Sequence, residues 1–231
     1  MYKLVPILTP VFLCFIIFTP AVVYAACSGA SPYRTAASNS QLDIQDCITA
    51  ASTEDTINVP AGTGMVTWSA PVTVNKAVKV VGPGAASLSV SWTGSSAMSI
   101  NGAVQVSGFK FVTNTAQTAI IVTGGNDWRI HHCEYVNTLA LNRGLFVWGG
   151  FAVVVKGLVD NCAIFDGMVA SGGAESGNWP QNAAAWRTPL DLGGDSAVYV
   201  EDCTFTLTSD WAANAMDGNR GSRYHHKAVN G

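Results

Sequence analysis

The fold is decided by the stretch Val104-Gln-Val-Ser-Gly-Phe109-Lys-Phe111 and by three stretches that align with it without gaps. These are Trp128-Arg-Ile-His-His-Cys133-Glu-Tyr135, Gly157-Leu-Val-Asp-Asn-Cys162-Ala-Ile164 and Val198-Tyr-Val-Glu-Asp-Cys203-Thr-Phe205. Their first and third positions are mostly apolar, two turn-like residues follow, and the sixth and eighth positions are mostly apolar. This alternation predicts two short strands joined by a two-residue corner.

The second residue of the corner tests this alignment. A sharp two-residue bend usually needs a positive φ, which Gly accepts freely and which Asn, Asp and His tolerate better than most residues. All four occupants belong to that set: Gly108, His132, Asn161 and Asp202. The alignment therefore predicts a repeated left-handed corner.

A third apolar strand, ending at a glycine, precedes each aligned pair. We expect these strands in Met98–Gly102, Ile120–Gly125, Leu145–Gly150 and Leu190–Gly194. The sixth positions, 109, 133, 162 and 203, are 24, 29 and 41 residues apart, which suits a stacked coil with loops on one side. We predict an all-β fold, a right-handed single-stranded parallel β-helix.

The same register predicts an inward ladder at the sixth positions: Phe109, Cys133, Cys162 and Cys203. Buried thiols that act as small hydrophobic groups explain the three cysteines better than disulfides do. Cys27 and Cys47 flank a segment whose two ends could close, and we expect them to form a disulfide.

The segment before the first coils predicts a lid for the open end of the solenoid. Ser40-Gln-Leu-Asp43 reads as a capping box that opens a short amphipathic helix from Gln41 to Ala51. Its expected apolar residues are Leu42, Ile44, Ile48 and Ala51. The first coils are then expected in Asp55–Gly62, Val72–Val74 and Val78–Gly82.

Residues 1–25 predict a cleaved signal peptide. Lys3 precedes an apolar run, and Val23-Tyr24-Ala25 offers a cleavage site after Ala25. A membrane anchor is the alternative, but prolines interrupt the run and no basic cluster follows. A lipoprotein with Cys27 as its first residue is a further option, which Tyr24 disfavours. We therefore expect a secreted protein, extracellular or periplasmic, with one β-helix domain over residues 26–231 and no membrane association after cleavage.

The charge balance excludes one class of partner. The chain carries 12 Lys and Arg against 15 Asp and Glu, a formal net charge of −3, and loss of Lys3 makes it −4. A protein that binds the phosphate backbone needs a basic surface. Nucleic acid is therefore not an expected partner.

Three motifs of this chain resemble the pectate-lyase-like superfamily of secreted right-handed β-helices. They are the helix-to-strand run from Leu42 to Gly62, the stretch Lys76-Ala-Val-Lys-Val-Val-Gly-Pro-Gly84, and the coil Arg129-Ile-His-His-Cys133. The resemblance covers residues 40–224 and implies the fold. The superfamily includes polysaccharide lyases, glycoside hydrolases, phage tail spikes and adhesins, so the resemblance leaves the activity open.

The chain departs from the best-known enzymes of that superfamily. Their Trp-Ile-Asp-His element has an Asp that helps to hold calcium, and His131 stands in its place here. Arg187-Thr-Pro-Leu-Asp lacks the second arginine of Arg-x-Pro-x-x-Arg, and the motifs of polygalacturonases are missing. These departures disfavour a calcium-dependent pectate lyase or a polygalacturonase, and the sequence assigns no cofactor and no metal site.

The end of the chain also departs from the repeat. Residues 217–224 resemble the start of a fifth coil, whereas residues 225–231 do not alternate. We expect a truncated or frame-shifted product.

The solvent face of the third strands is the expected ligand site. Phe146 and Trp148 alternate with the inward positions there, and sugar rings stack on such aromatics. The glycine-rich insertion from Phe165 to Arg187 contains Trp179 and Trp186 and could form a wall over this face. The alternative is that these aromatics cover a small core of the loop. The expected substrate-binding residues are Phe146, Trp148, Trp179, Trp186 and Arg187.

Asp191 and Asp217 are the expected catalytic carboxylates, with Arg220 beside them. The two Asp residues occupy matching repeat positions, and stacked carboxylates raise the pKa of one partner. An arginine could bind the carboxylate of an acidic sugar. Turn formation by Asp is the simpler alternative. A metal site could be built from two columns of corner residues, His131–Asp160–Glu201 and His132–Asn161–Asp202. The simpler explanation is that these residues are exposed to solvent at the corners.

The sequence predicts a secreted carbohydrate-active or carbohydrate-binding β-helix protein with a polysaccharide as its partner. If it is an enzyme, we expect a polysaccharide lyase or a glycoside hydrolase. A non-catalytic surface, adhesive or structural β-helix is the competing class, because no complete catalytic motif is present.

Overall fold

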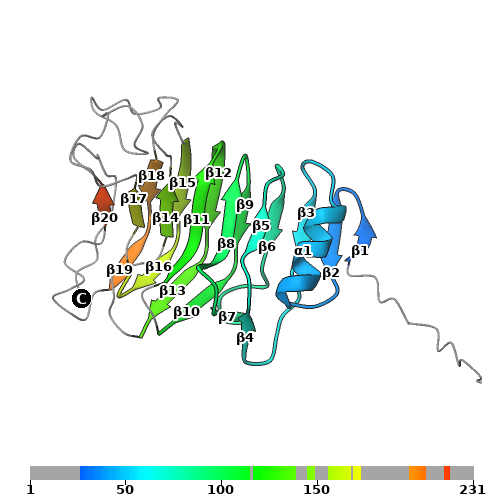
Figure 1. The fold of residues 1–231 in the computed structure, drawn as a ribbon, viewed down its shortest axis with the longest axis horizontal. Coiled ribbons are helices and arrows are strands. Elements are labelled where there is room, and N and C mark those ends of the chain that lie inside the picture. Colours follow the sequence, from blue (N-terminus) through cyan, green and yellow to red (C-terminus); the bar gives the residue numbers. More distant parts are fainter. Residues whose placement is uncertain are drawn as a thin grey trace, which may run out of the picture.

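Three sheets, parallel except for one antiparallel pair of strands at the start of the chain (27–30 with 33–36), wind around one narrow apolar core in the computed structural model (Figure 1). The structure describes residues 27–114, 117–138, 145–148, 156–167, 169–172, 198–206 and 216–218. The chain passes through the sheets in a repeating order, so that each strand pairs with the corresponding strand of the next coil. This arrangement is a right-handed parallel β-helix with an N-terminal capping helix, and it confirms the predicted fold.

The strands fall into three sheets, which we name A, B and C. Sheet A contains β1 (Cys27–Ala30), β2 (Tyr33–Ala36), β3 (Thr56–Asn58), β6 (Lys79–Val81), β9 (Gln105–Ser107), β12 (Asn126–His131), β15 (Lys156–Asp160) and β18 (Val198–Glu201). Sheet B contains β4 (Met65–Trp68), β7 (Ser89–Trp92), β10 (Lys110–Thr113), β13 (Glu134–Asn137), β16 (Ala163–Phe165) and β19 (Thr204–Thr206). Sheet C contains β5 (Val72–Val74), β8 (Ser96–Asn101), β11 (Thr118–Gly124), β14 (Leu145–Trp148), β17 (Val169–Gly172) and β20 (Met216–Gly218).

The corners between sheets A and B confirm the predicted backbone. The φ angles are 75° at Gly108, 52° at His132, 52° at Asn161 and 48° at Asp202. Their amides bond across coils, as in the bond from the His132 N–H to the Asp160 carbonyl at 3.3 Å. The residues before the corners pair in register, and the third positions of the aligned stretches are buried. The gapless alignment therefore describes the real register.

The ladder that follows the corners is also confirmed. Phe109, Cys133, Cys162 and Cys203 are buried, and the three cysteines are free thiols. Thiol groups at these positions contact backbone carbonyls, for example Cys162 Sγ and the Asp160 oxygen at 3.3 Å. A hydrogen bond with Cys162, followed by burial, raises the pKa of Cys203, which keeps that thiol neutral. The cysteines thus act as small core residues.

Sheet C corrects one predicted strand. We expected Leu190–Gly194 to precede the last aligned pair, but β17 occupies that place between β14 and β20. The positive φ of Asp166, 48°, turns the chain from β16 directly into β17. The insertion therefore follows β17 and does not precede the sheet C strand. Residues 190–194 lie outside the described residues.

The capping helix, α1 (Gln41–Ala50), begins as predicted. The Ser40 hydroxyl accepts a hydrogen bond from the Asp43 N–H at 3.2 Å, while the Asp43 carboxylate accepts from the Ser38 hydroxyl. Ile44, Cys47 and Ile48 are buried, but Leu42 is 64% exposed and does not belong to the apolar face. Leu42 lies two residues before Ile44, about 200° around the helix, and so faces away from the core.

Side chains fasten α1 to the first coils. The Gln45 amide bonds both backbone groups of Thr73, at 2.7 and 3.1 Å, and so satisfies the edge of sheet C much as another strand would. Lys76 Nζ donates to the carbonyls of Thr49 at 2.6 Å and Ala51 at 3.0 Å, at the C-terminal end of the helix. The predicted Cys27–Cys47 disulfide joins β1 to α1.

A buried carboxylate organises the start of sheet A. Asp55 is fully buried and accepts hydrogen bonds from Ser31 Oγ at 2.5 Å, Arg34 Nε at 2.6 Å and the Ser52 N–H at 2.9 Å. These hydrogen bonds, with that of Ser31 first, lower the pKa of Asp55 to about 2. The charged form of Asp55 therefore stabilises the folded cap.

We expect acid to weaken the cap through Asp55. The folded protein holds this carboxyl at a pKa of about 2, whereas an unfolded chain titrates near the ordinary value of about 3.9. The contribution of Asp55 is therefore fully present above about pH 4 and is lost as the pH falls toward 2. Urea unfolding between pH 2 and pH 7 should show a steeper acid loss for the parent than for Asp55→Asn. Equal slopes would contradict this role.

We also expect Gly157→Ala to destabilise the fold. A Cβ at Gly157 would overlap the buried Trp128 indole, which packs directly on this glycine from the preceding coil. Overpacking of this kind costs about 1–3 kcal/mol. Gly94→Ala is the matched control, because the nearest atom to its Cβ would be Pro71 Cδ at 3.5 Å, an ordinary van der Waals contact. Denaturant unfolding should separate the two variants, and an unchanged midpoint for Gly157→Ala would contradict the contact.

Candidate functional surfaces

The outer face of sheet C carries the predicted aromatic positions. Val72, Met98 and Ile120 are buried in register, so the alternating column beside them faces outward. That column runs through consecutive strands as Thr73, Ser99, Ile121, Phe146, Ala170 and Asp217. Phe146 shares the register of this column, and its role in a ligand site stays a prediction.

Trp148 occupies the last position of β14, in register with Gly172 of β17. Phe146, two residues earlier, is in register with Ala170 of the same strand. Both neighbours on β17 are therefore among the smallest residues.

The structure describes one member of the predicted acidic pair, Asp217. Asp217 of β20 is in register with Ala170, so its sheet neighbour comes from β17 and not from the strand expected around Asp191. Asp191 lies outside the described residues, as do Trp179, Trp186, Arg187 and Arg220. The structure thus gives a backbone position for Phe146, Trp148 and Asp217, and the rest of the predicted site stays a prediction.

The outer face of sheet A holds an ion pair that sequence reasoning missed. Arg129 of β12 donates from Nε to Asp160 Oδ1 at 2.8 Å and from Nη2 to Oδ2 at 2.7 Å. The Asp160 side chain is 5% exposed and also accepts from Asn161 Nδ2 at 2.8 Å. These hydrogen bonds, with that of Arg129 first, lower the pKa of Asp160, although its burial opposes the shift.

Two histidines lie beside this pair. His131 is in register with Ser107 on one side and with Asp160 on the other. Its Nδ1 lies 2.8 Å from Nδ1 of His132, so one ring donates and the other accepts. Burial, followed by the charge of Arg129, lowers the pKa of His131. His131 is thus a neutral hydrogen-bonding group near pH 7.

The structure refines the prediction for the two columns at the corner. The column His131–Asp160–Glu201 exists in register, but Asp160 is buried and ion-paired rather than an exposed corner residue. Within the described ranges, no group of His, Cys, Asp and Glu is arranged to hold a metal ion. The sequence alignment could have predicted the ion pair. Arg129 is the second residue of its aligned stretch, and Asp160 is the fourth residue of the next stretch, so the two side chains lie diagonally opposite each other on adjacent coils.

The outer face of sheet B offers less chemistry. Lys110 and Glu134 are neighbours in register and form an ion pair at 2.7 Å, so each satisfies the charge of the other. The next outward column contains Val112, Val136 and Phe165. A partly exposed pair of this kind contributes little to stability and presents no free charged group.

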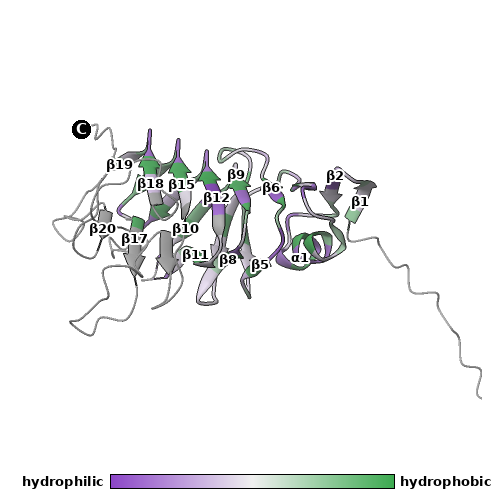
Figure 2. Ribbon diagram, turned by 90° about the horizontal axis from the view of Figure 1, so that it is seen from above, coloured by the Kyte–Doolittle hydropathy of each residue, from purple (hydrophilic) through white to green (hydrophobic). Residues whose placement is uncertain are grey.

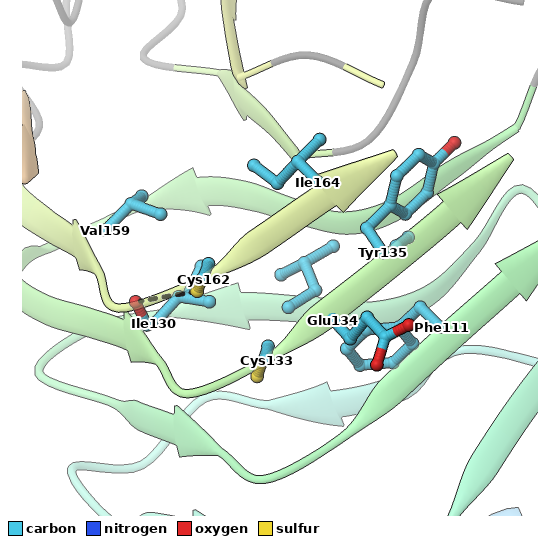
Figure 3. Close-up of a pocket in the computed structure, with 10 residues that line it drawn as sticks. Phe111, Ile130, Cys133, Glu134, Tyr135, Val159, Cys162 and Ile164 are labelled. Carbon is cyan, nitrogen blue, oxygen red and sulfur yellow. Dashed lines mark hydrogen bonds between the residues drawn. The ribbon is translucent and has the colours of Figure 1, made fainter. Parts of the chain in front are cut away.

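An internal cavity lies between the sheets and is too small for a substrate. Figure 3 shows it between Phe111, Tyr135, Cys133, Cys162 and Ile164. Its volume of about 30 Å³ is room for one or two water molecules. Its lining is almost entirely apolar, and burial raises the pKa of the Tyr135 phenol, so that this group stays neutral. We assign no ligand to this cavity.

Comparison with known proteins yields no family. No protein-family model matches the chain, and no curated protein does so either. Among solved structures, a pectin methylesterase variant in complex with a hexasaccharide is 12% identical and has a TM-score of 0.43, over 80% of this chain and 68% of that one. The deglycosylated pectin methylesterase from Aspergillus niger is 11% identical and has a TM-score of 0.44, over 89% of this chain and 88% of that one. Structural similarity as low as that to these two pectin methylesterases supports no inference about activity.

In the described residues, no helix is long and apolar enough to cross a membrane.

Proposed function

We propose that this chain is a secreted, pectate-lyase-like β-helix protein that binds a polysaccharide along the outer face of sheet C. The observation that carries the proposal is the position of Phe146 and Trp148 in outward register beside Ala170 and Gly172. Stacked parallel strands lie about 4.8 Å apart, so a column of this kind offers repeated contacts along an extended chain. Aromatic rings suit the apolar faces of sugars.

Export is part of this proposal. Residues 1–25 have the features of a signal peptide, with cleavage after Ala25. The Cys27–Cys47 disulfide supports an oxidising compartment, because disulfides persist mainly in exported proteins.

The proposed chemistry stays with the residues selected from the sequence. Asp191, Asp217 and Arg220 are the proposed catalytic groups, and Trp179, Trp186 and Arg187 are proposed to complete the binding face. Asp217 lies in the outward column that contains Phe146, with Ala170 between them. A carboxylate on this column would lie close to a chain bound over the aromatic positions.

We expect Trp148→Ala to weaken polysaccharide binding by about 1 kcal/mol or more, because a stacking aromatic is lost. The matched control is Phe165→Ala, which removes a partly exposed aromatic from sheet B. Affinity electrophoresis against acidic and neutral polysaccharides, followed by assays for unsaturated ends and reducing ends, tests binding and turnover separately. Binding without turnover would favour the non-catalytic, adhesive alternative.

A parent protein that binds none of these polysaccharides would remove the support for the proposal. So would an unchanged retention of Trp148→Ala on a polysaccharide that the parent binds. Weaker binding by Phe165→Ala, with Trp148→Ala unaffected, would move the binding face from sheet C to sheet B.

A further inference from the structure

One edge of the Arg129 guanidinium is held firmly and the other is open. Its Nε–H and one Nη2–H bind the two oxygens of Asp160 at 2.8 and 2.7 Å. A guanidinium has five N–H donors, so three remain, and two of these, one on Nη1 and one on Nη2, form a second edge. No described residue accepts from them, and the Arg129 side chain is 41% exposed. Arg129 thus presents an oriented pair of donors to solvent.

The anchor of this arginine is built into the fold. Asp160 is almost fully buried, receives a third hydrogen bond from Asn161, and lies directly before the positive-φ corner. Its low pKa keeps it charged, so the arginine stays fixed over the working pH range. A side chain that is held in place before its ligand arrives loses less conformational entropy on binding.

Arg129 differs in this respect from the other ion-paired cations of the described chain. The Arg34 side chain is only 19% exposed and is directed at the buried Asp55. Lys110 is paired with Glu134 on its own sheet face, as a single ammonium group with no second edge. Only a guanidinium can hold one carboxylate with one edge and offer a matching fork to another.

The neighbours of Arg129 suit a sugar. In register with it, Gln105 lies on β9 and Leu158 on β15, and Tyr199 follows on β18. Figure 2 shows β9, β12, β15 and β18 side by side, with a hydrophilic stretch on β12. An amide can bond hydroxyl groups, and aliphatic and aromatic side chains can support the apolar face of a ring.

We propose that the outer face of sheet A is a second saccharide site, specific for a sugar that carries a carboxylate. The sugar carboxylate binds the Nη1 and Nη2 edge of Arg129, and the ring lies along Gln105, Leu158 and Tyr199. This site lies on a different sheet from the aromatic face of sheet C, and the two are independent.

Local charge sets the strength of this site. The side chains of Arg129, Asp160 and Glu201 carry one positive and two negative charges. Glu201 is exposed, lies in register with Asp160 and interacts electrostatically with Arg129. It therefore repels an incoming carboxylate, and we expect an affinity in the millimolar range. Removal of this charge should strengthen binding, an effect that loss of structure would not produce.

Calorimetric titration of the secreted protein with tetragalacturonate tests the proposal, with fully methyl-esterified tetragalacturonate as the uncharged ligand. We expect Arg129→Lys to weaken binding about five-fold, because lysine keeps the charge but loses the planar fork. Glu201→Gln should strengthen it about two- to five-fold. Lys110→Gln, which removes a cation from sheet B, should leave it unchanged. Thermal unfolding of each variant shows whether the fold is intact.

Several outcomes would overturn the proposal. The first is that tetragalacturonate and its methyl ester bind equally well. The second is that neither Arg129→Lys nor Glu201→Gln changes the affinity. The third is that acetate binds as tightly as tetragalacturonate, in a manner that depends on Arg129. The last result would assign the site to any free carboxylate. Binding that depends on Trp148 but not on Arg129 would place the ligand on sheet C alone and overturn the second site only.

Discussion

The two-residue corner between sheets A and B is the constraint on which the rest of this structure depends. A positive φ at Gly108, His132, Asn161 and Asp202 turns the chain from sheet A into sheet B within two residues. A connection of two residues allows little variation in the relative position of the strands that it joins, so successive coils stack with the same register. Every inward and outward column of the β-helix follows, because side chains alternate strictly along a strand.

Strict register also explains why the three outer faces differ. Each outward column is built from one residue per coil, so a pair of complementary residues on adjacent coils meets directly. On sheet B this brings Lys110 to Glu134, and their charges are satisfied. On sheet A the diagonal contact of Arg129 with the buried Asp160 uses only one edge of the arginine. On sheet C it brings aromatic positions beside Ala170 and Gly172. The chemistry of each face is therefore a property of pairs of coils, not of single strands.

Local patterns predicted much of the fold. The corner residues, the buried cysteine ladder and the Ser40 cap follow from steric and hydrogen-bonding rules that act within a few residues. Leu42 was predicted to face the core because it is apolar, but its angular position on the helix places it opposite the buried Ile44, and it is exposed. β17 shows another limit, because Val169-Ala-Ser-Gly172 is too small and too weakly apolar to stand out as a strand. Its place is decided by pairing with β14 and β20 on either side.

The β-helix can be predicted from the amino-acid sequence, because alternation and positive-φ corners are local constraints that repeat. The sequence also predicted which residues enter the core ladder, and it indicated the Cys27–Cys47 pair. The ion pair between Arg129 and Asp160 is seen only in the tertiary structure. Thirty-one residues separate the two side chains in sequence (|i−j| = 31), and their contact depends on the stacking of two coils. The same stacking sets the charge states: hydrogen bonds lower the pKa values of Asp55 and Asp160, and burial lowers that of His131, only when the coils have closed around them.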